Sequence, residues 1–185
     1  MKKLFLITLT LLIAIPAMTQ ELSPKERRKL QKEMKREQQL AEAAEKNAIV
    51  KLMLEHGTFV LEADRLRDAR GNQVNVSSMI NFVAIDSIHA VIQVGSNSYV
   101  GANGVGGFTV EGPVSKYEVE YSEKRGTWSV SYHVRSTSGN YDVRMSVFGE
   151  GRAEATVSSS WPGRITYSGY LYPPGVSKVY KGTSY

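Results

Sequence analysis

Cysteine is absent from this chain of 185 residues. Without cysteine the chain can form no disulfide framework, no thiolate zinc site and no cysteine nucleophile, and it offers no sulfur for a lipid anchor. The folded part must therefore be stable by packing alone.

The chain also lacks an apolar run long enough to span a membrane permanently. Its apolar run at residues 4–15 is interrupted only by two threonines, and twelve helical residues span only about 18 Å against a hydrocarbon core of roughly 30 Å. Lys2 and Lys3 precede this run, and small residues follow it. This order is typical of a cleaved signal peptide over residues 1–20. We therefore expect an exported protein, periplasmic and soluble, with no lipid anchor and no permanent transmembrane helix after cleavage.

Neither sign of charge dominates the expected folded part. The whole chain has a formal net charge of +5, but residues 57–185 contain twelve basic and eleven acidic residues. Non-specific nucleic-acid binding needs several phosphates to be neutralised by one basic face. We therefore expect no nucleic-acid partner.

Residues 21–56 have the pattern of a charged helical lead-in. Ser23, Pro24 and Glu26 form a helix-start signature, in which the Ser23 hydroxyl caps the first turn and the Glu26 carboxylate reaches back. No glycine or further proline follows until Gly57. The pattern predicts one long charged α-helix over residues 24–56. Because apolar residues are concentrated near its C-terminal end, we expect that end to pack on the folded body.

After Gly57 the hydrophobic period changes from helical to alternating, which is typical of half-buried antiparallel strands. Segments with this pattern lie at residues 58–64, 79–85, 88–94, 108–111, 114–121, 128–135, 141–147, 153–158 and 165–172. Most of them are separated by short turn signals. We predict a mainly β domain over residues 57–185, an antiparallel meander of eight or nine strands. Such a sheet curls into a sandwich or an open barrel, with the apolar end of the helix as a cover.

The order of glycines and aromatics along this domain resembles a known family. The residues that carry the resemblance are Gly106-Gly107-Phe108, residues 128–132, residues 141–147 followed by Gly149 and Gly151, and residues 164–167 followed by Gly169. This order is similar to the exported domain-of-unknown-function family 4251 of Gram-negative bacteria. The resemblance implies a β-rich envelope domain and assigns no activity, substrate or catalytic residue.

A glycine-rich stretch at residues 101–107 is the first candidate site. It lacks the Gly-Lys-Ser/Thr ending and the following helix of a phosphate-binding loop. A connection with positive φ angles is the simpler interpretation. As a functional hypothesis, Gly104, Gly106 and Gly107, together with Tyr99 and Phe108, flank a ligand pocket at the mouth of the curled sheet.

Tyrosine is the most frequent aromatic residue, with ten copies. Tyr167, Tyr170 and Tyr172 lie close together on the last predicted strand, and aromatic faces on a sheet can stack on sugars or peptides. Core filling explains most of them equally well.

The residues Asp86-Ser87-Ile88 match a bacterial O-glycosylation pattern, which makes Ser87 a candidate modification site, although a hairpin turn explains the same residues.

Histidine is scarce, and the three histidines are dispersed without metal-ligand spacing. No Gly-x-Ser-x-Gly elbow proposes a nucleophile. We expect no catalytic residue, no metal and no cofactor.

The favoured hypothesis is a non-enzymatic binding or accessory module of the cell envelope whose partner is an envelope protein, a glycan or an apolar ligand. The alternatives are a structural assembly module acting through the charged helix and, less favoured, a hydrolase.

Overall fold

The computed structural model of this chain describes residues 23–96, 98, 101, 103–159 and 163–184. The predicted signal peptide and Tyr99 lie outside these residues. The chain divides into two units, residues 1–38 and residues 39–185.

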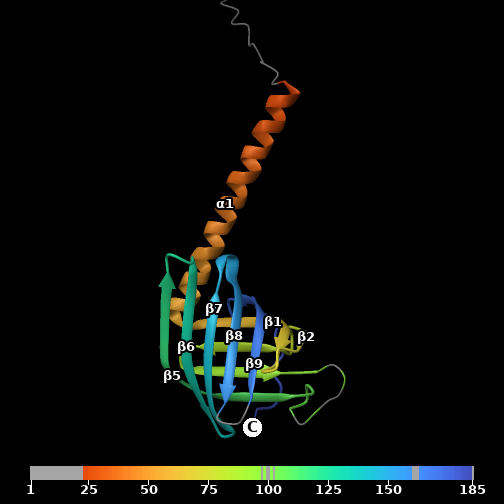
Figure 1. Cartoon of the computed structure of the whole chain (residues 1–185), viewed down its shortest axis with the longest axis vertical. Helices are drawn as coiled ribbons and strands as arrows, with labels where there is room; N and C mark the ends of the chain where they lie inside the picture. Colours follow the sequence, from red (N-terminus) through yellow and green to blue (C-terminus); the bar gives the residue numbers. More distant parts are fainter. Residues whose placement is uncertain (1–22, 97, 99–100, 102, 160–162, 185) are drawn as a thin grey trace, which may run out of the picture. The chain divides into compact units, whose positions relative to one another are not determined.

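Helix α1 runs over Pro24–His56, as the sequence predicts (Figure 1). At its start the Ser23 backbone N–H donates to the Glu26 carboxylate at 2.9 Å, and the Glu26 N–H donates to the Ser23 hydroxyl at 3.3 Å. This is the predicted capping box. Residues 24–38 are exposed along the whole of their length. Only Val50, Met53 and Leu54, near the C-terminal end, are buried.

The second unit consists of the end of α1 and a β-sheet. The strands are β1 (Thr58–Arg67), β2 (Gln73–Asn75), β3 (Phe82–Asp86), β4 (His89–Val94), β5 (Phe108–Ser122), β6 (Thr127–Ser136), β7 (Gly139–Val147), β8 (Arg152–Ser159) and β9 (Arg164–Tyr172). All neighbouring strands pair antiparallel, in the order β2-β1-β3-β4-β5-β6-β7-β8-β9. The predicted mainly β antiparallel meander behind one long charged helix is confirmed.

The sheet closes on itself, because β1 also pairs with β9. The result is a closed barrel of eight antiparallel strands, to which β2 is added beside the second half of β1. Between Ala63 and Arg65 the register of this pairing shifts by a β-bulge, and bulges bend a strand and increase its twist. The closing pair turns the curled meander of the sequence analysis into a barrel without a free edge between β1 and β9.

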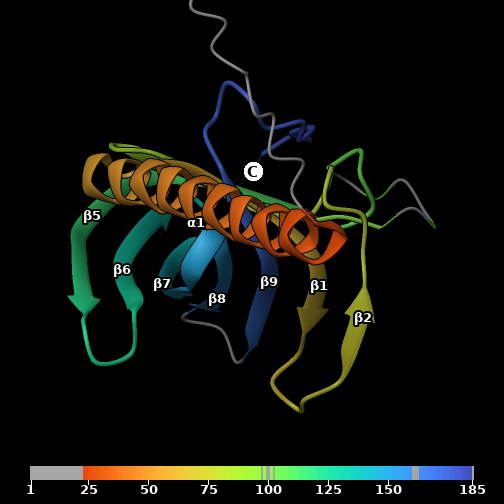
Figure 2. The same cartoon turned by 90° about the horizontal axis from the view of Figure 1, so that it is seen from above.

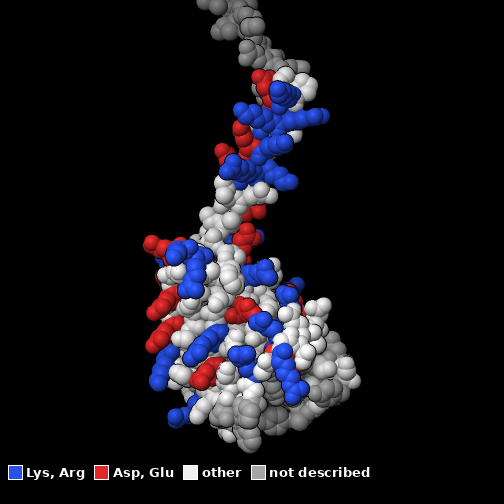
Figure 3. All heavy atoms as spheres, in the orientation of Figure 1, with Lys and Arg blue, Asp and Glu red and all other residues white. Residues whose placement is uncertain are grey.

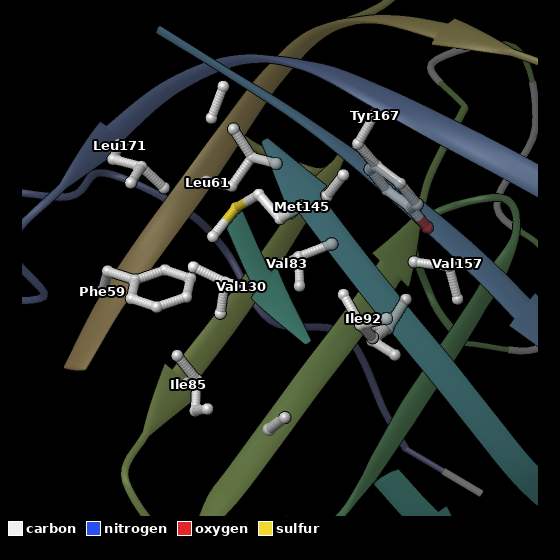
Figure 4. Packing of buried hydrophobic residues seen from close by; sticks show 14 of the residues in the cluster. Phe59, Leu61, Val83, Ile85, Ile92, Val130, Met145, Val157, Tyr167 and Leu171 are labelled. Atoms are coloured by element: carbon white, nitrogen blue, oxygen red, sulfur yellow. The ribbon is translucent and has the colours of Figure 1, made fainter. Parts of the chain in front are cut away.

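The barrel interior is filled by apolar side chains from every strand of the barrel (Figure 4). They come from alternate positions, as in Val130, Tyr132 and Val134 of β6. The outward positions of β5 to β8 are polar, and Figure 3 shows basic and acidic side chains interspersed over the barrel surface in that view.

The end of α1 covers one end of the barrel. Val50, Met53 and Leu54 belong to the same buried cluster as the barrel interior. The Tyr117 hydroxyl on β5 donates to the Leu54 carbonyl at 2.6 Å, which satisfies one of the carbonyls that a helix end leaves without a partner. The predicted cover therefore exists, and the opposite end of the barrel has no helix over it among the described residues (Figure 2).

The C-terminal segment, residues 173–184, contains no helix or strand and lies along the outer wall of the barrel, where it forms hydrogen bonds to β1, β4 and β5. The Ser177 hydroxyl donates to the Glu62 carboxylate at 2.8 Å, and the Tyr180 N–H donates to the Met79 carbonyl at 2.7 Å. This cover explains why Gln93, on the outward face of β4, is buried.

Candidate functional site

The end of the barrel opposite α1 contains a cavity of about 440 Å³, hereafter the mouth cavity. It lies where β1, β7, β8 and β9 reach the turns that face away from the helix. Its lining residues are Asp68, Ala69, Arg70, Phe108, Tyr141, Val157, Ser159, Gly163, Arg164, Ile165 and Tyr167. Pockets for small ligands have volumes of about 300 to 1,000 Å³, so this cavity is large enough to hold one.

The walls of the mouth cavity are apolar because the strands that build it turn alternate residues inward. Val157 of β8 pairs with Ile165 of β9, and Tyr167 pairs with Ala155. Tyr141 enters from β7, and Phe108 enters from the first position of β5. An apolar ligand would therefore bury its surface against the same side chains that fill the barrel at the end opposite α1.

Tyr167 lies inside the barrel wall and is 0% exposed. Its hydroxyl has no hydrogen-bond partner among the described residues, and it points toward Val157, a second lining residue (Figure 4). Burial, reinforced by the neighbouring Tyr132 and Tyr141, raises the pKa of this phenol far above its usual value. The hydroxyl therefore stays protonated and can donate to a polar atom placed in the mouth cavity.

Three charged residues, Asp68, Arg70 and Arg164, line the outer edge of the mouth cavity, hereafter the rim. Asp68 begins the turn between β1 and β2, and its carboxylate accepts from the Arg70 N–H at 2.8 Å and from the Asn72 N–H at 2.9 Å. These bonds, and first of all the one from the Asn72 side chain, lower the pKa of Asp68. Arg70 and Arg164 are exposed lining residues, and neither side chain forms an ion pair with a described carboxylate. Among the described lining residues, two positive groups thus stand beside one carboxylate that is already hydrogen-bonded in its own turn.

The structure brings only one described residue of the predicted glycine-loop site to this cavity, namely Phe108. Gly104 and Gly106 have φ angles of +76°, which agrees with the interpretation of the stretch as a positive-φ connection. A Cβ on Gly107 would lie 2.0 Å from the Val94 carbonyl oxygen, so this glycine is required by close packing. The loop is held by the buried Asn103, whose side-chain oxygen accepts from the Val105 and Gly107 N–H groups at 3.1 and 3.0 Å.

The sequence analysis named Tyr167 only with Tyr170 and Tyr172, as aromatics that can form a binding face, and it missed Arg70 and Arg164 as site residues. The alternation of β9 contained the signal for Tyr167, because it puts Tyr167 inside the barrel and leaves Tyr170 and Tyr172 outside, at 46% and 37% exposure. The two arginines carried no sequence signal, because only the closure of the barrel brings the β1–β2 turn beside the start of β9.

Ser87 lies in the exposed turn between β3 and β4 with a φ of 75°. Its hydroxyl donates to the carbonyl of His56, the last residue of α1, at 2.7 Å, and its N–H donates to the Gly57 carbonyl at 2.7 Å. The residue thus joins the end of the helix to the barrel. Glycosylation of Ser87 stays a prediction, and it would remove the hydroxyl proton that this hydrogen bond uses.

The three histidines are separated in the fold. His56 ends α1 and His89 begins β4. His133, on the outer wall of β6, contacts the carboxylate of Asp142 on β7 through Nδ1. Ser115 is the cross-strand neighbour of His133, but within the described residues its hydroxyl makes no hydrogen bond to the imidazole. This exposed outer wall therefore brings together two members of a triad without the hydrogen bond that activates a serine.

Among the described residues, no group of three or more histidine, aspartate and glutamate side chains is arranged to hold a metal ion. Within the same residues, no helix has the length and apolar character needed to cross a membrane.

Comparisons with known proteins agree with this architecture. Residues 41–171 match the family described as "Domain of unknown function (DUF4251)". A solved structure, that of a DUF4251 family protein from Bacteroides eggerthii, is similar with a TM-score of 0.59 and 30% sequence identity. The similarity covers 72% of this chain and 91% of the other. No curated protein matches.

Proposed function

This chain belongs to the DUF4251 family, and we propose that it is a non-enzymatic binding module of the cell envelope that takes a small apolar ligand into the mouth cavity. The observation that carries the proposal is a cavity of about 440 Å³ with apolar walls, into which the fully buried Tyr167 presents a hydroxyl without a partner among the described residues. Ligand pockets have this composition, an apolar lining with a few placed polar groups.

The barrel suits this role because its two ends differ. The helix end is closed by Val50, Met53 and Leu54, which belong to the core. The other end contains the mouth cavity, whose wall residues Val157 and Ile165 lie on paired strands. A rigid sheet that is held at one end can present a preformed site at the other, which limits the entropy lost on binding.

Residues 1–20 support a place in the envelope, because their order of basic, apolar and small residues is that of an export signal. The histidines support a non-enzymatic role, because His56, His89 and His133 are separated and none lines the mouth cavity.

Native mass spectrometry of the protein purified from its own cells tests the proposal. We expect a small molecule that leaves on denaturation. In Ile165→Lys, which places an ammonium group on the cavity wall, we expect this molecule to be lost. Val176→Lys, on the C-terminal segment at 63% exposure, is the matched control and should keep it. Circular dichroism verifies that both variants fold.

A wild-type protein without a bound small molecule, or a ligand retained by folded Ile165→Lys, would contradict binding at the mouth cavity. The same spectra distinguish the other hypotheses. A dimer without ligand favours assembly through the charged helix, and a mass increment that survives denaturation and disappears in Ser87→Ala identifies glycosylation.

A further inference from the structure

We infer that the ligand of the mouth cavity is an amphipathic acid, with an anionic group at the rim, an apolar middle and a second oxygen at its inner end. The inference rests on the proposed function, and it names the chemical class of ligand from the polar groups around the cavity. The anionic group is inferred from the arginines of the rim, the apolar middle from the cavity wall, and the inner oxygen from the Tyr167 hydroxyl.

The rim selects an anion. The charged lining residues are Asp68, Arg70 and Arg164. The Asp68 carboxylate accepts hydrogen bonds from two N–H groups of its own turn and from the Asn72 side chain, which leaves it poorly placed to pair with an arginine. Two guanidinium groups without a carboxylate partner among the described residues attract a carboxylate, a sulfate or a phosphate, which they can bind through paired N–H groups.

The middle of the ligand is apolar because the cavity wall is apolar. Phe108, Tyr141, Val157 and Ile165 line the mouth cavity together with Tyr167. These side chains offer dispersion contacts and few hydrogen bonds, so a sugar or a peptide would leave polar groups unpaired there, at a cost. This observation separates the amphipathic acid from the glycan and peptide partners considered from the sequence.

The inner oxygen is required by Tyr167. The Tyr167 hydroxyl is already buried without a described partner, so a purely apolar chain would leave it unpaired, whereas an oxygen at the inner end of the ligand would accept a hydrogen bond from it. The hydroxyl has no described partner, and Tyr167 is 0% exposed. The phenol is protonated at neutral pH at its ordinary pKa, and burial raises that pKa further. The site therefore contains a buried donor at one end and two exposed guanidinium groups at the other.

Isothermal titration calorimetry on the whole protein with three probes of equal chain length separates these contributions. Decanoate carries the acid, decanol replaces the acid by a neutral hydroxyl, and omega-hydroxydecanoate adds an oxygen at the far end. We expect decanoate to bind about tenfold more tightly than decanol, a gain typical of charge-assisted hydrogen bonds, and this preference to shrink at high salt. We expect omega-hydroxydecanoate to bind a few-fold more tightly than decanoate, as for one neutral hydrogen bond.

Two variants assign each preference to its residues. Arg70→Gln combined with Arg164→Gln should remove the preference for decanoate over decanol, whereas Arg152→Gln, on β8 at the helix end of the barrel, should keep it. Tyr167→Phe should remove or reverse the preference for omega-hydroxydecanoate over decanoate. Since each result is a ratio between two ligands on one protein, a general loss of affinity in a variant does not imitate it.

The outcomes separate this inference from the proposed function. If the three probes bind with equal affinity, the mouth cavity accepts apolar chains and the amphipathic acid is wrong. If the double arginine variant or Tyr167→Phe leaves its ratio unchanged, the assignment of that end is wrong. If none of the probes binds, the proposed function fails together with the inference.

Discussion

Tyr167 lines the mouth cavity, and its buried hydroxyl has no hydrogen-bond partner among the described residues. It occupies the same strand as Tyr170 and Tyr172, yet alternation points Tyr167 into the barrel and the other two outward. A buried hydroxyl without a partner costs roughly 1 to 3 kcal/mol. The same is true of Tyr132, which does not line the mouth cavity, so only the place of Tyr167 on the cavity wall relates its hydroxyl to a ligand.

Replacing Tyr167 by Phe tests that cost directly. We expect Tyr167→Phe to raise the free energy of unfolding of the ligand-free protein by about 1 kcal/mol, because a desolvated hydroxyl is removed and the ring is kept. Tyr117→Phe is the matched control, because the Tyr117 hydroxyl donates to Leu54 at 2.6 Å. Its loss should lower the free energy of unfolding by about 1 kcal/mol. Urea unfolding measures both changes, and a destabilised Tyr167→Phe would mean that the hydroxyl has a partner.

Among the elements, the contact between β1 and β9 decides the architecture. Gly169 of β9 pairs with Ala63, next to the β-bulge, and a Cβ on Gly169 would lie 1.9 Å from the carbonyl oxygen of Glu62. The two strands approach so closely that only glycine fits. Since the Arg164 end of β9 and the Arg70 turn meet through this pairing, the rim of the mouth cavity depends on it as well.

Gly169→Ala should therefore disturb the closing contact. We expect a loss of about 2 to 4 kcal/mol in the free energy of unfolding, because the clash is with backbone atoms that cannot rotate away. Gly175→Ala, with no atom within 4 Å of the added Cβ, is the control and should change stability little. Thermal unfolding measures both variants. A Gly169→Ala protein as stable as the wild type would show that β1 and β9 lie farther apart than described.

Most helix and strand positions could be predicted from the sequence, whereas the pairing of β1 with β9 that closes the barrel could not. Alternation predicted most strands, and the start signature at Ser23 with the stop at Gly57 predicted the helix bounds, because both kinds of pattern are local. It divided β5 into two segments at Gly112-Pro113, whereas the strand continues through them: Pro113 pairs with His89, and Gly112 lies where a Cβ would meet the Arg135 carbonyl at 1.9 Å. The three-residue β2 was missed because it is too short to show a period.

The candidate site was less predictable than the fold, because its residues come together only when the barrel closes. Phe108 was predicted at the mouth of the sheet, and it lines the mouth cavity there. The glycines beside it serve the packing of their own loop, for which Asn103 provides the hydrogen bonds. Arg70 and Arg164 lie in turns that are far apart in the sequence. They come close together only through the register of the β1–β9 pairing, which no local sequence pattern predicts.

At the scale of the whole molecule, buried tyrosines make the free energy of unfolding depend on pH in the alkaline range. Burial raises the pKa of Tyr117 from 10.0 to about 12 and raises the pKa of Tyr132 and Tyr167 further. In the unfolded chain each phenol loses its proton near pH 10, whereas in the fold it keeps the proton. The folded state then binds more protons than the unfolded state, and linkage requires stability to fall as the pH rises.

We therefore expect the free energy of unfolding to be insensitive to these groups below about pH 10 and to decrease above it. The two fully buried tyrosines each contribute a slope of up to about 1.4 kcal/mol per pH unit, whereas Tyr117 contributes less because it is partly exposed. Urea unfolding at a series of alkaline pH values measures the slope. Tyr167→Phe should reduce it, while Tyr180→Phe, at 63% exposure, should leave it unchanged. An equal slope in the wild type and in Tyr167→Phe would mean that the Tyr167 phenol ionises as readily in the fold as in water, and the closed, dry barrel interior would then be wrong.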